Sequence, residues 1–219
     1  YYAPSDHYIF KITCYSNKTA GDVLVFKYFN PQSNIVYNLD RSVNFVPGLN
    51  IGTNESPMIM NVGSDFSVTF PVGWSWFSIN SSLDNMTLGF ILSSVSTPGD
   101  YIKSQVSSAT YYAGYGWFGS LSQIDMGKLY KIKIQNSNTT HFSGRPADIS
   151  AIQIPVVSGW NWIGYLPHSS LPIGTALSSL TLSNLDYIKS QVSSATYYTG
   201  YGWFGSLSSL APSQGYMLK

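Results

Sequence analysis

Catalysis in a folded protein needs titratable side chains that converge on one site, and this sequence offers few of them. Its three histidines, His7, His141 and His168, lie in separate polar stretches, and Cys14 is the single cysteine. The sequence contains none of the short motifs of zinc proteases, serine hydrolases, redox dithiols or phosphate-binding loops. We therefore expect no catalytic site, no metal site and no cofactor.

One group of polar residues occurs twice, 86 positions apart. Its members are Asp100, Lys103 and Gln105 in the first copy and Asp186, Lys189 and Gln191 in the second. One interpretation is that the lysines and glutamines bind a sugar or a carboxylate. The other is structural: the aspartate caps a turn, while the lysine and glutamine line a solvated edge strand. Each copy holds one acid, whereas glycoside cleavage needs two acids flanking one bond.

Aromatic residues are also duplicated, in stretches that read YYAGYGWF and YYTGYGWF. Exposed aromatic rings can stack on sugars, and Tyr and Trp are enriched at interfaces. The candidate ligand-binding residues are Tyr112, Tyr115, Trp117, Tyr198, Tyr201 and Trp203, together with Lys103, Gln105, Lys189 and Gln191. The alternative is that these aromatic residues fill a core or an interface. We expect four other tryptophans in the core: Trp74, Trp76, Trp160 and Trp162.

The duplication sets the domain organisation. Residues 100–122 and 186–208 are identical except for Ala113 and Thr199, and the correspondence extends beyond them. We define repeat 1 as residues 66–144 and repeat 2 as residues 145–219, which follow an unrelated N-terminal domain of residues 1–65. Stacked repeats bury surface against their neighbours and can extend into arrays.

The N-terminal domain contains short strand-like runs at 9–15, 23–29, 35–39 and 43–46, separated by turn residues. This spacing predicts a small β-sandwich-like domain, with Cys14 buried on the first strand. Each repeat predicts a mainly β, α+β unit. Its elements in repeat 1 are a strand at 73–80, a short helix at 88–95, a three-stranded meander at 101–121 and a closing strand at 129–134. The helix of repeat 2 is expected at 175–180. We expect the closing strands, 129–134 and 216–219, to be sheet edges available to another chain.

Composition narrows the setting. Charged residues make up 10% of the chain, against roughly 25% in typical globular proteins, and the net charge is +1. Such a chain has no positive electrostatic field that would attract nucleic acid. Its sequence also has no apolar run long enough to span a membrane. Several Asn-x-Ser/Thr sequons are candidate glycosylation sites: Asn17, Asn80, Asn85 and Asn138.

Longer motifs carry a resemblance to a known group of proteins. The segments GWNWIGYLP, ALSSL, DYIKSQ, ATYY, GYGWFGSL and GYMLK resemble tandem modules of large secreted cell-surface proteins from bacteria and marine microbial eukaryotes. The N-terminal stretch GDVLVFKYFNPQSNIVYNL resembles the domain that often precedes those modules. The resemblance implies export and an extracellular or cell-surface location, and it supplies no catalytic residues.

These observations leave three functional hypotheses. The first is a non-catalytic structural or adhesive module that contacts copies of itself or neighbouring surface proteins, in an assembly such as a filament. The second is a bivalent carbohydrate-binding module that uses the repeated Tyr/Trp hairpins, since two sites can raise avidity by a factor of about 10²–10⁴. The third is a domain of an enzyme, or an accessory to an enzyme that lies elsewhere in a longer chain.

Overall fold

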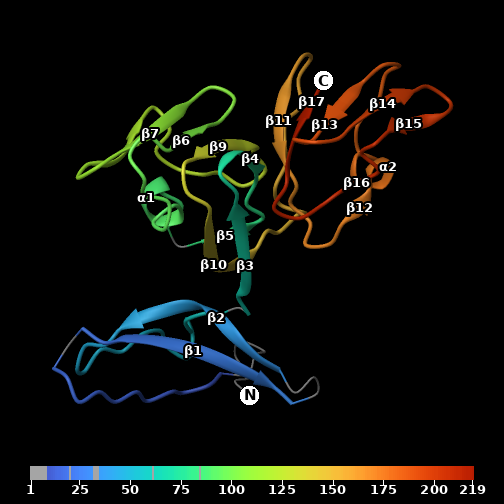
Figure 1. Ribbon diagram of the computed structural model, residues 1–219. Coiled ribbons are helices and arrows are strands. Elements are labelled where there is room, and N and C mark those ends of the chain that lie inside the picture. Colours follow the sequence, from blue (N-terminus) through green and yellow to red (C-terminus); the bar gives the residue numbers. More distant parts are fainter. Residues whose placement is uncertain (1–8, 20, 32–34, 61, 84) are drawn as a thin grey trace. The chain divides into compact units, whose positions relative to one another are not determined.

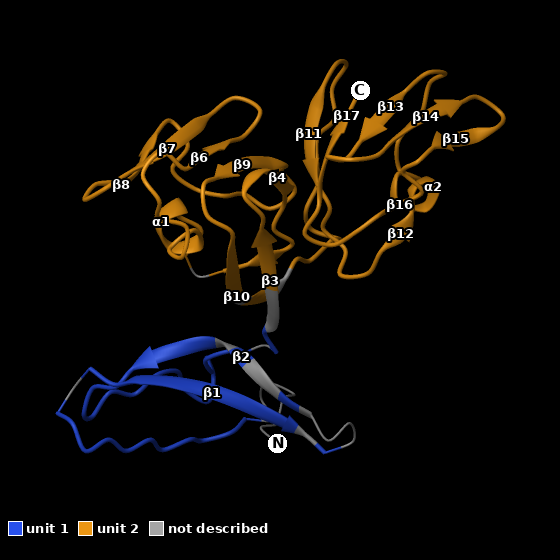
Figure 2. Ribbon diagram, in the orientation of Figure 1, with its two compact units in different colours: residues 1–64 blue, residues 65–219 orange. Residues whose placement is uncertain are grey.

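The computed structural model describes residues 9–19, 21–31, 35–60, 62–83 and 85–219 (Figure 1). Its contacts divide the chain into two compact units, residues 1–64 and 65–219 (Figure 2). The second unit contains both repeats. The prediction of a mainly β protein with a few short helices is confirmed, because strands dominate and each of the two helices has four residues. Within the described residues, neither helix has the length or apolar character to cross a lipid bilayer.

The first unit is simpler than the sequence predicted. Strands β1 (Val23–Asn30) and β2 (Ile35–Asn44) form an antiparallel pair with an irregularity between Val25 and Lys27. The two strands expected at 35–39 and 43–46 are thus one. No strand forms at 9–15, where Phe10 is exposed and Cys14 is only partly buried. Among the described residues this unit therefore holds one two-stranded sheet in place of a sandwich, and the expectation of a buried Cys14 was wrong.

Each repeat is built around a five-stranded antiparallel sheet (Figure 1). In repeat 1 the strand order is β4-β9-β6-β7-β8, and in repeat 2 it is β11-β17-β13-β14-β15. The first sheet comprises β4 (Gly73–Phe77), β6 (Tyr101–Lys103), β7 (Ser108–Tyr112), β8 (Gly116–Gly119) and β9 (Tyr130–Ile134). The second comprises β11 (Asn161–Gly164), β13 (Tyr187–Lys189), β14 (Ser194–Tyr198), β15 (Gly202–Gly205) and β17 (Gly215–Leu218). Equal order in both sheets reflects the duplicated sequence.

The closing strand of each repeat does not lie at an edge. Strand β9 pairs with both β4 and β6, and β17 pairs with both β11 and β13. The prediction of edges at 129–134 and 216–219 was therefore wrong, and so was the edge position assumed for the strand that carries Lys103. Strand order depends on long-range pairing, which the alternation of side chains along one strand does not encode. The strands that end the two orders are β4, β8, β11 and β15.

The remaining elements differ between the repeats. Repeat 1 carries α1 (Leu88–Ile91) and a second sheet, ordered β3-β10-β5. Its strands are β3 (Ser64–Phe70), β5 (Ser81–Ser82) and β10 (Asn138–Pro146), the last of which runs across the boundary expected at 144/145. Repeat 2 carries α2 (Ile173–Ala176) and the short pair β12 (Leu171–Pro172) and β16 (Ser209–Leu210). Residues 151–157, just before its first strand, are coil and turn.

Each repeat has a separate hydrophobic core, one formed by buried residues between positions 68 and 142 and the other between 163 and 218. The core face of β4 carries Ser75 and Phe77, and that of β11 carries Asn161 and Ile163. Because side chains alternate along a strand, the tryptophans point to the opposite face. Trp74 and Trp160 are 41% and 38% exposed, and Trp76 and Trp162 are half-buried. The prediction that these four tryptophans lie in the core was therefore wrong.

Candidate functional site

The two glutamines of the repeated polar group join the repeats. Gln105 Nε2 donates to the Trp160 carbonyl at 2.8 Å, and its Oε1 accepts from the Trp162 amide at 2.9 Å. Gln191 makes the reciprocal pair with repeat 1, donating to the Trp74 carbonyl at 2.7 Å and accepting from the Trp76 amide at 2.8 Å. Each carboxamide thus bonds to the free edge of the facing strand as a neighbouring peptide group would. The two repeats are therefore related by an approximate two-fold axis, with the same surface used on both sides.

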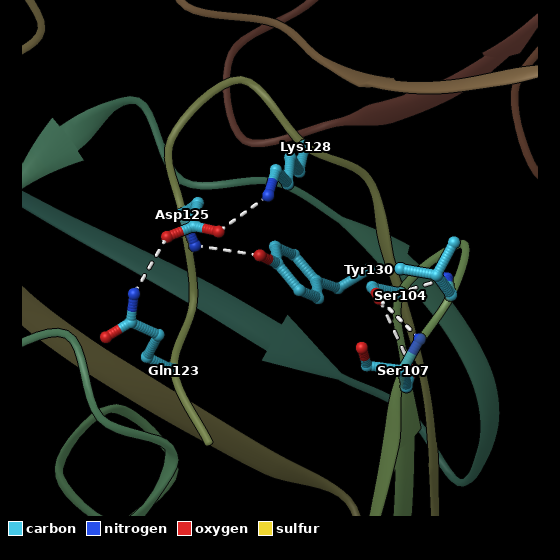
Figure 3. Close-up of polar contacts among 7 residues, drawn as sticks. Ser104, Ser107, Gln123, Asp125, Lys128 and Tyr130 are labelled. Carbon is cyan, nitrogen blue, oxygen red and sulfur yellow. Dashed lines mark hydrogen bonds and ion pairs between the residues drawn. The ribbon is translucent and has the colours of Figure 1, made fainter. Parts of the chain in front are cut away.

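A short turn holds each glutamine in place. The Ser107 amide donates to Ser104 Oγ at 3.0 Å, and the Ser104 amide donates to the Ser107 carbonyl at 2.8 Å (Figure 3). Ser190 and Ser193 form the same turn around Gln191. Local serine bonds of this kind fix a turn without help from a distant element. The identity of these serines in both copies thus has a structural reason.

Backbone bonds extend the same contact. The Ser78 amide donates to the Ser213 carbonyl at 3.0 Å, and the Gly164 amide donates to the Gly127 carbonyl at 2.9 Å. These bonds are equivalent under the repeat correspondence. Together with the glutamines, they cover the outer edges of β4 and β11, which would otherwise be open to another strand.

Lysines and tryptophans alternate across the contact between the repeats. Lys131 Nζ lies 3.9 Å from the ring centre of Trp76 and 4.1 Å from that of Trp162. Lys103 lies over Trp74 and Trp162, and Lys189 over Trp160 and Trp76, at 5.3–6.0 Å. Each such cation–π contact contributes about 0.5–2 kcal/mol, depending on how dry it is. Four of the ten candidate ligand-binding residues, Lys103, Gln105, Lys189 and Gln191, are therefore engaged between the repeats.

At the centre of this contact the two repeats carry different residues. Lys131 corresponds to Met217, and Lys131 Nζ lies 3.1 Å from Met217 Sδ. Burial, with the like charges of Lys103 and Lys189, lowers the pKa of Lys131 to about 8, while the indole faces favour its charged form. A second lysine at 217 would place two ammonium groups together near the axis. The sequence difference at this position therefore fits the contact.

Two further pairs of positions are matched in size. Gly215 is the counterpart of Leu129 in repeat 2. A Cβ at Gly215 would come within 2.9 Å of both Leu129 Cβ and the Phe77 carbonyl oxygen. Gly164 is the counterpart of Ser78 in repeat 2. A Cβ at Gly164 would lie 2.8 Å from Ser78 Cβ. Our sequence analysis missed these residues. The signal that identifies them is the change of residue at 129/215, 131/217 and 78/164 within otherwise similar copies.

The duplicated aspartates cap turns, as the structural interpretation predicted. Asp100 Oδ2 accepts from the Thr97 amide at 3.1 Å, and Asp186 Oδ2 accepts from the Ser183 amide at 2.7 Å. Asp100 is 1% exposed, and its Oδ1 accepts from the Gln135 amide at 2.9 Å. Asp186 is less buried.

Buried tyrosines support the closing strands from the core side. Tyr130 Oη accepts from the Asp125 amide at 2.7 Å, and Asp125 also pairs with Lys128 at 2.7 Å (Figure 3). Tyr216 Oη accepts from the Ala211 amide in the same way, at 2.9 Å. Burial raises the pKa of Tyr130 to about 12, so its hydroxyl stays protonated at neutral pH. These tyrosines are structural and face no solvent.

The duplicated aromatic stretches form hairpins at the outer ends of the second unit, β7–β8 in one repeat and β14–β15 in the other (Figure 1). At their tips Tyr115 is 88% exposed and Tyr201 is 82% exposed. Tyr112 and Tyr198 are also exposed, at 51% and 41%. We call these two features the aromatic hairpins; their exposed rings are Tyr112, Tyr115, Phe118, Tyr198, Tyr201 and Phe204.

Trp117 and Trp203 differ from the exposed rings. Both are partly buried and pack against the two hydrophobic cores. Trp117 makes an edge-on contact with Tyr111 at 5.7 Å between ring centres, and Trp203 does so with Tyr197 at 5.5 Å. Their indole nitrogens are buried and have no partner within the described residues. The geometry thus favours a supporting position for these tryptophans beneath the exposed tyrosines.

The sequons lie in different surroundings. Asn17 and Asn85 are exposed. Asn80 is 2% exposed, and its Nδ2 lies 3.4 Å from both the Pro167 carbonyl oxygen and His168 Nδ1. The folded chain leaves no room for a glycan there, so the prediction of Asn80 as a glycosylation site was wrong. Asn138 is partly exposed, and its Nδ2 donates to the Ser94 carbonyl at 2.5 Å.

Across the described ranges, no group of three or more His, Cys, Asp or Glu side chains is placed to hold a metal ion. The chain matches no protein-family model, no curated protein and no solved structure. Its function must therefore be argued from its own surfaces.

Proposed function

We propose that this chain is a non-catalytic structural or adhesive module of the extracellular surface, which meets neighbouring molecules through its aromatic hairpins. The observation that carries the proposal is the exposure of Tyr115 and Tyr201, at 88% and 82%, on two matching hairpins at opposite ends of the second unit. Large rings held in water without a local structural role are typical of interaction sites.

Strand order supports the same proposal. Strands β8 and β15 end their sheets, whereas the other end strands, β4 and β11, are covered by the facing repeat. An end strand presents unpaired backbone groups to a neighbouring chain. Two such ends that face outward give a contact that need not close on itself, and a contact of this kind generates extended assemblies.

The extracellular setting rests on sequence. The low charge, the exposed sequons Asn17 and Asn85, and the resemblance to modules of secreted surface proteins all favour export. In that setting the joined repeats act as a rigid spacer whose two ends carry the same chemistry.

A second candidate function is bivalent carbohydrate binding. It is favoured by the ring geometry of the second hairpin, where Tyr198 and Phe204 meet edge-on with ring centres 5.8 Å apart. Such a pair leaves aromatic faces free to stack on a sugar ring. On this hypothesis Tyr115 and Tyr201 contact the glycan, and Trp117 and Trp203 support them from below.

Sedimentation velocity over a wide range of protein concentration tests the first proposal. We expect the wild-type chain to associate, and the double variant Tyr115→Ser/Tyr201→Ser to associate less. The matched control is Val106→Ser/Val192→Ser, which removes apolar side chains that are 89% and 91% exposed elsewhere on the same meanders. A wild-type chain that stays monomeric throughout contradicts self-assembly. Glycan-array binding that the tyrosine variant loses, and the control keeps, would favour the second candidate.

A further inference from the structure

The sheet faces that lie opposite the two hydrophobic cores share one row of alternating lysine and tryptophan side chains. Each pair of neighbours in the row is a cation–π contact, with Nζ 3.9–6.0 Å from the ring centre. We call this feature the Lys/Trp row, and its order is Trp74, Lys103, Trp162, Lys131, Trp76, Lys189, Trp160. The order is the same from either end under the repeat correspondence, so the row is one surface built from both repeats.

The lysines of the row have no acidic partner. Among the described residues, no carboxylate lies within ion-pair distance of Lys103, Lys131 or Lys189. Burial, with the like charges of Lys103 and Lys189, also lowers the pKa of Lys131. Positive charge is thus gathered here against its own repulsion, in a chain whose net charge is only +1. A negative group placed on the row would relieve that repulsion.

The row is open to a ligand. Trp74 is 41% exposed, although the chain continues from Lys133, the residue that lies opposite it in β9. Lys133 is itself exposed and adds an ammonium group beside this end of the row. Trp160, at the other end, is 38% exposed. Because the indole rings already hold the ammonium groups in place, a ligand that binds them costs little further side-chain entropy.

The chemistry of the row selects a class of ligand. A sugar ring can stack on an exposed indole. Lysine attracts a sulfate group as a point charge, whereas the planar fork that matches a carboxylate belongs to arginine, which the row lacks. Single-stranded nucleic acid stacks successive bases on open aromatic faces, but the inner rings of Trp76 and Trp162 already have the Lys131 ammonium over them. A polymer of sugar rings that bear sulfate groups therefore fits the row best.

We propose that the Lys/Trp row binds a sulfated glycan chain, with sulfate groups on Lys103 and Lys189 and sugar rings against Trp74 and Trp160. Neither repeat carries the whole alternation by itself, so the site exists only where the two repeats are joined. The proposal goes beyond the proposed function, because the row shares no residue with the aromatic hairpins. A glycan on the row would leave both hairpins free to contact neighbouring molecules.

Isothermal titration calorimetry with size-fractionated dextran sulfate tests the proposal on the full chain. We expect saturable binding that weakens as salt is added, and no binding of uncharged dextran. Lys103→Gln/Lys189→Gln should weaken binding about tenfold, because two charged contacts are lost. Lys103→Arg/Lys189→Arg keeps both charges and should bind nearly as well as the wild type. Trp74→Leu should weaken binding about threefold or more, because a stacking surface is lost.

The matched control is Lys27→Gln/Lys128→Gln, which removes the same charge from exposed lysines outside the row. It should bind dextran sulfate as the wild type does, which separates contacts at the row from the effect of net charge. The melting temperature of each variant shows that binding is compared between folded proteins. Tyr115→Ser/Tyr201→Ser should also keep the binding, so this proposal and the proposed function can fail separately.

Three results would overturn the proposal. The first is no binding of dextran sulfate by the wild type at low salt. The second is an equal loss of affinity in the control and in Lys103→Gln/Lys189→Gln, which would leave net charge as the whole cause. The third is binding of a thymidine oligonucleotide of matched charge as tightly as dextran sulfate, which would assign the row to nucleic acid.

Discussion

Replacing both interface glutamines with alanine should loosen the contact between the repeats. Gln105 and Gln191 make four hydrogen bonds in total, at 2.7–2.9 Å, to backbone groups of the facing edge strands. A net hydrogen bond contributes about 0.5–1.5 kcal/mol, and both glutamines are exposed residues, so the lower half of that range applies. We expect each single variant to lose about 1–2 kcal/mol and the double variant about 2–4 kcal/mol.

Differential scanning calorimetry provides the assay. For a unit of this size, 1 kcal/mol lowers the melting temperature by about 2–4 °C, so the double variant, which loses about 2–4 kcal/mol, should melt roughly 4–16 °C below the wild type. Gln153→Ala, at an exposed glutamine outside the contact, is the matched control and should melt with the wild type. Since each repeat has its own core, the transition should also broaden or split. A double variant that melts like the control would refute the reasoning.

Three further predictions follow from the same contacts. Met217→Lys should destabilise the second unit by about 1–3 kcal/mol in urea unfolding, because it adds a charge beside Lys131; equal stability would contradict the matched pair. Because the pKa of Lys131 falls to about 8 in the fold, protons bind the unfolded chain more strongly, so stability should rise between about pH 8 and 10.5. Because the Lys131 side chain is only partly buried, screening by solvent limits this gain to about 1 kcal/mol at most. The gain should vanish in Lys131→Met, and a gain that persists in that variant refutes the prediction. Gly119→Ala should cost about 2 kcal/mol or more, because its Cβ would meet the backbone at 108–109, and circular dichroism melting would contradict this by showing no change.

Sequence patterns predicted the secondary-structure elements of the repeats better than they predicted which elements pack or pair with one another. The meander strands β6, β7 and β8 follow from alternating side chains and from turn residues such as Gly114, which has φ +78°. The tryptophans of GWSWF were assigned to the wrong face because Phe77 and Trp76 are both large and apolar, so alternation marks a strand without marking its buried side. Only the facing repeat decides that question.

Two other features could not be predicted from the sequence of one repeat taken by itself. The position of β9 between β4 and β6 depends on pairing across about 30 to 60 residues of chain, which local patterns do not carry. The function of Gln105 depends on Trp160 and Trp162, which lie in the other repeat. In contrast, the difference between Gly99 and Leu185, which both have positive φ, is visible in the two aligned copies.

Hydrogen exchange at two backbone amides tests the central claim, which is that the repeats are joined reciprocally through their glutamines. The amides of Trp76 and Trp162 point outward from end strands, and their acceptors are Gln191 and Gln105. Both amides should be protected in the wild type. Gln105→Ala should release Trp162 more than Trp76, and Gln191→Ala should do the opposite. Rapid exchange of both amides in the wild type, at the rate of an open strand edge, would contradict the account.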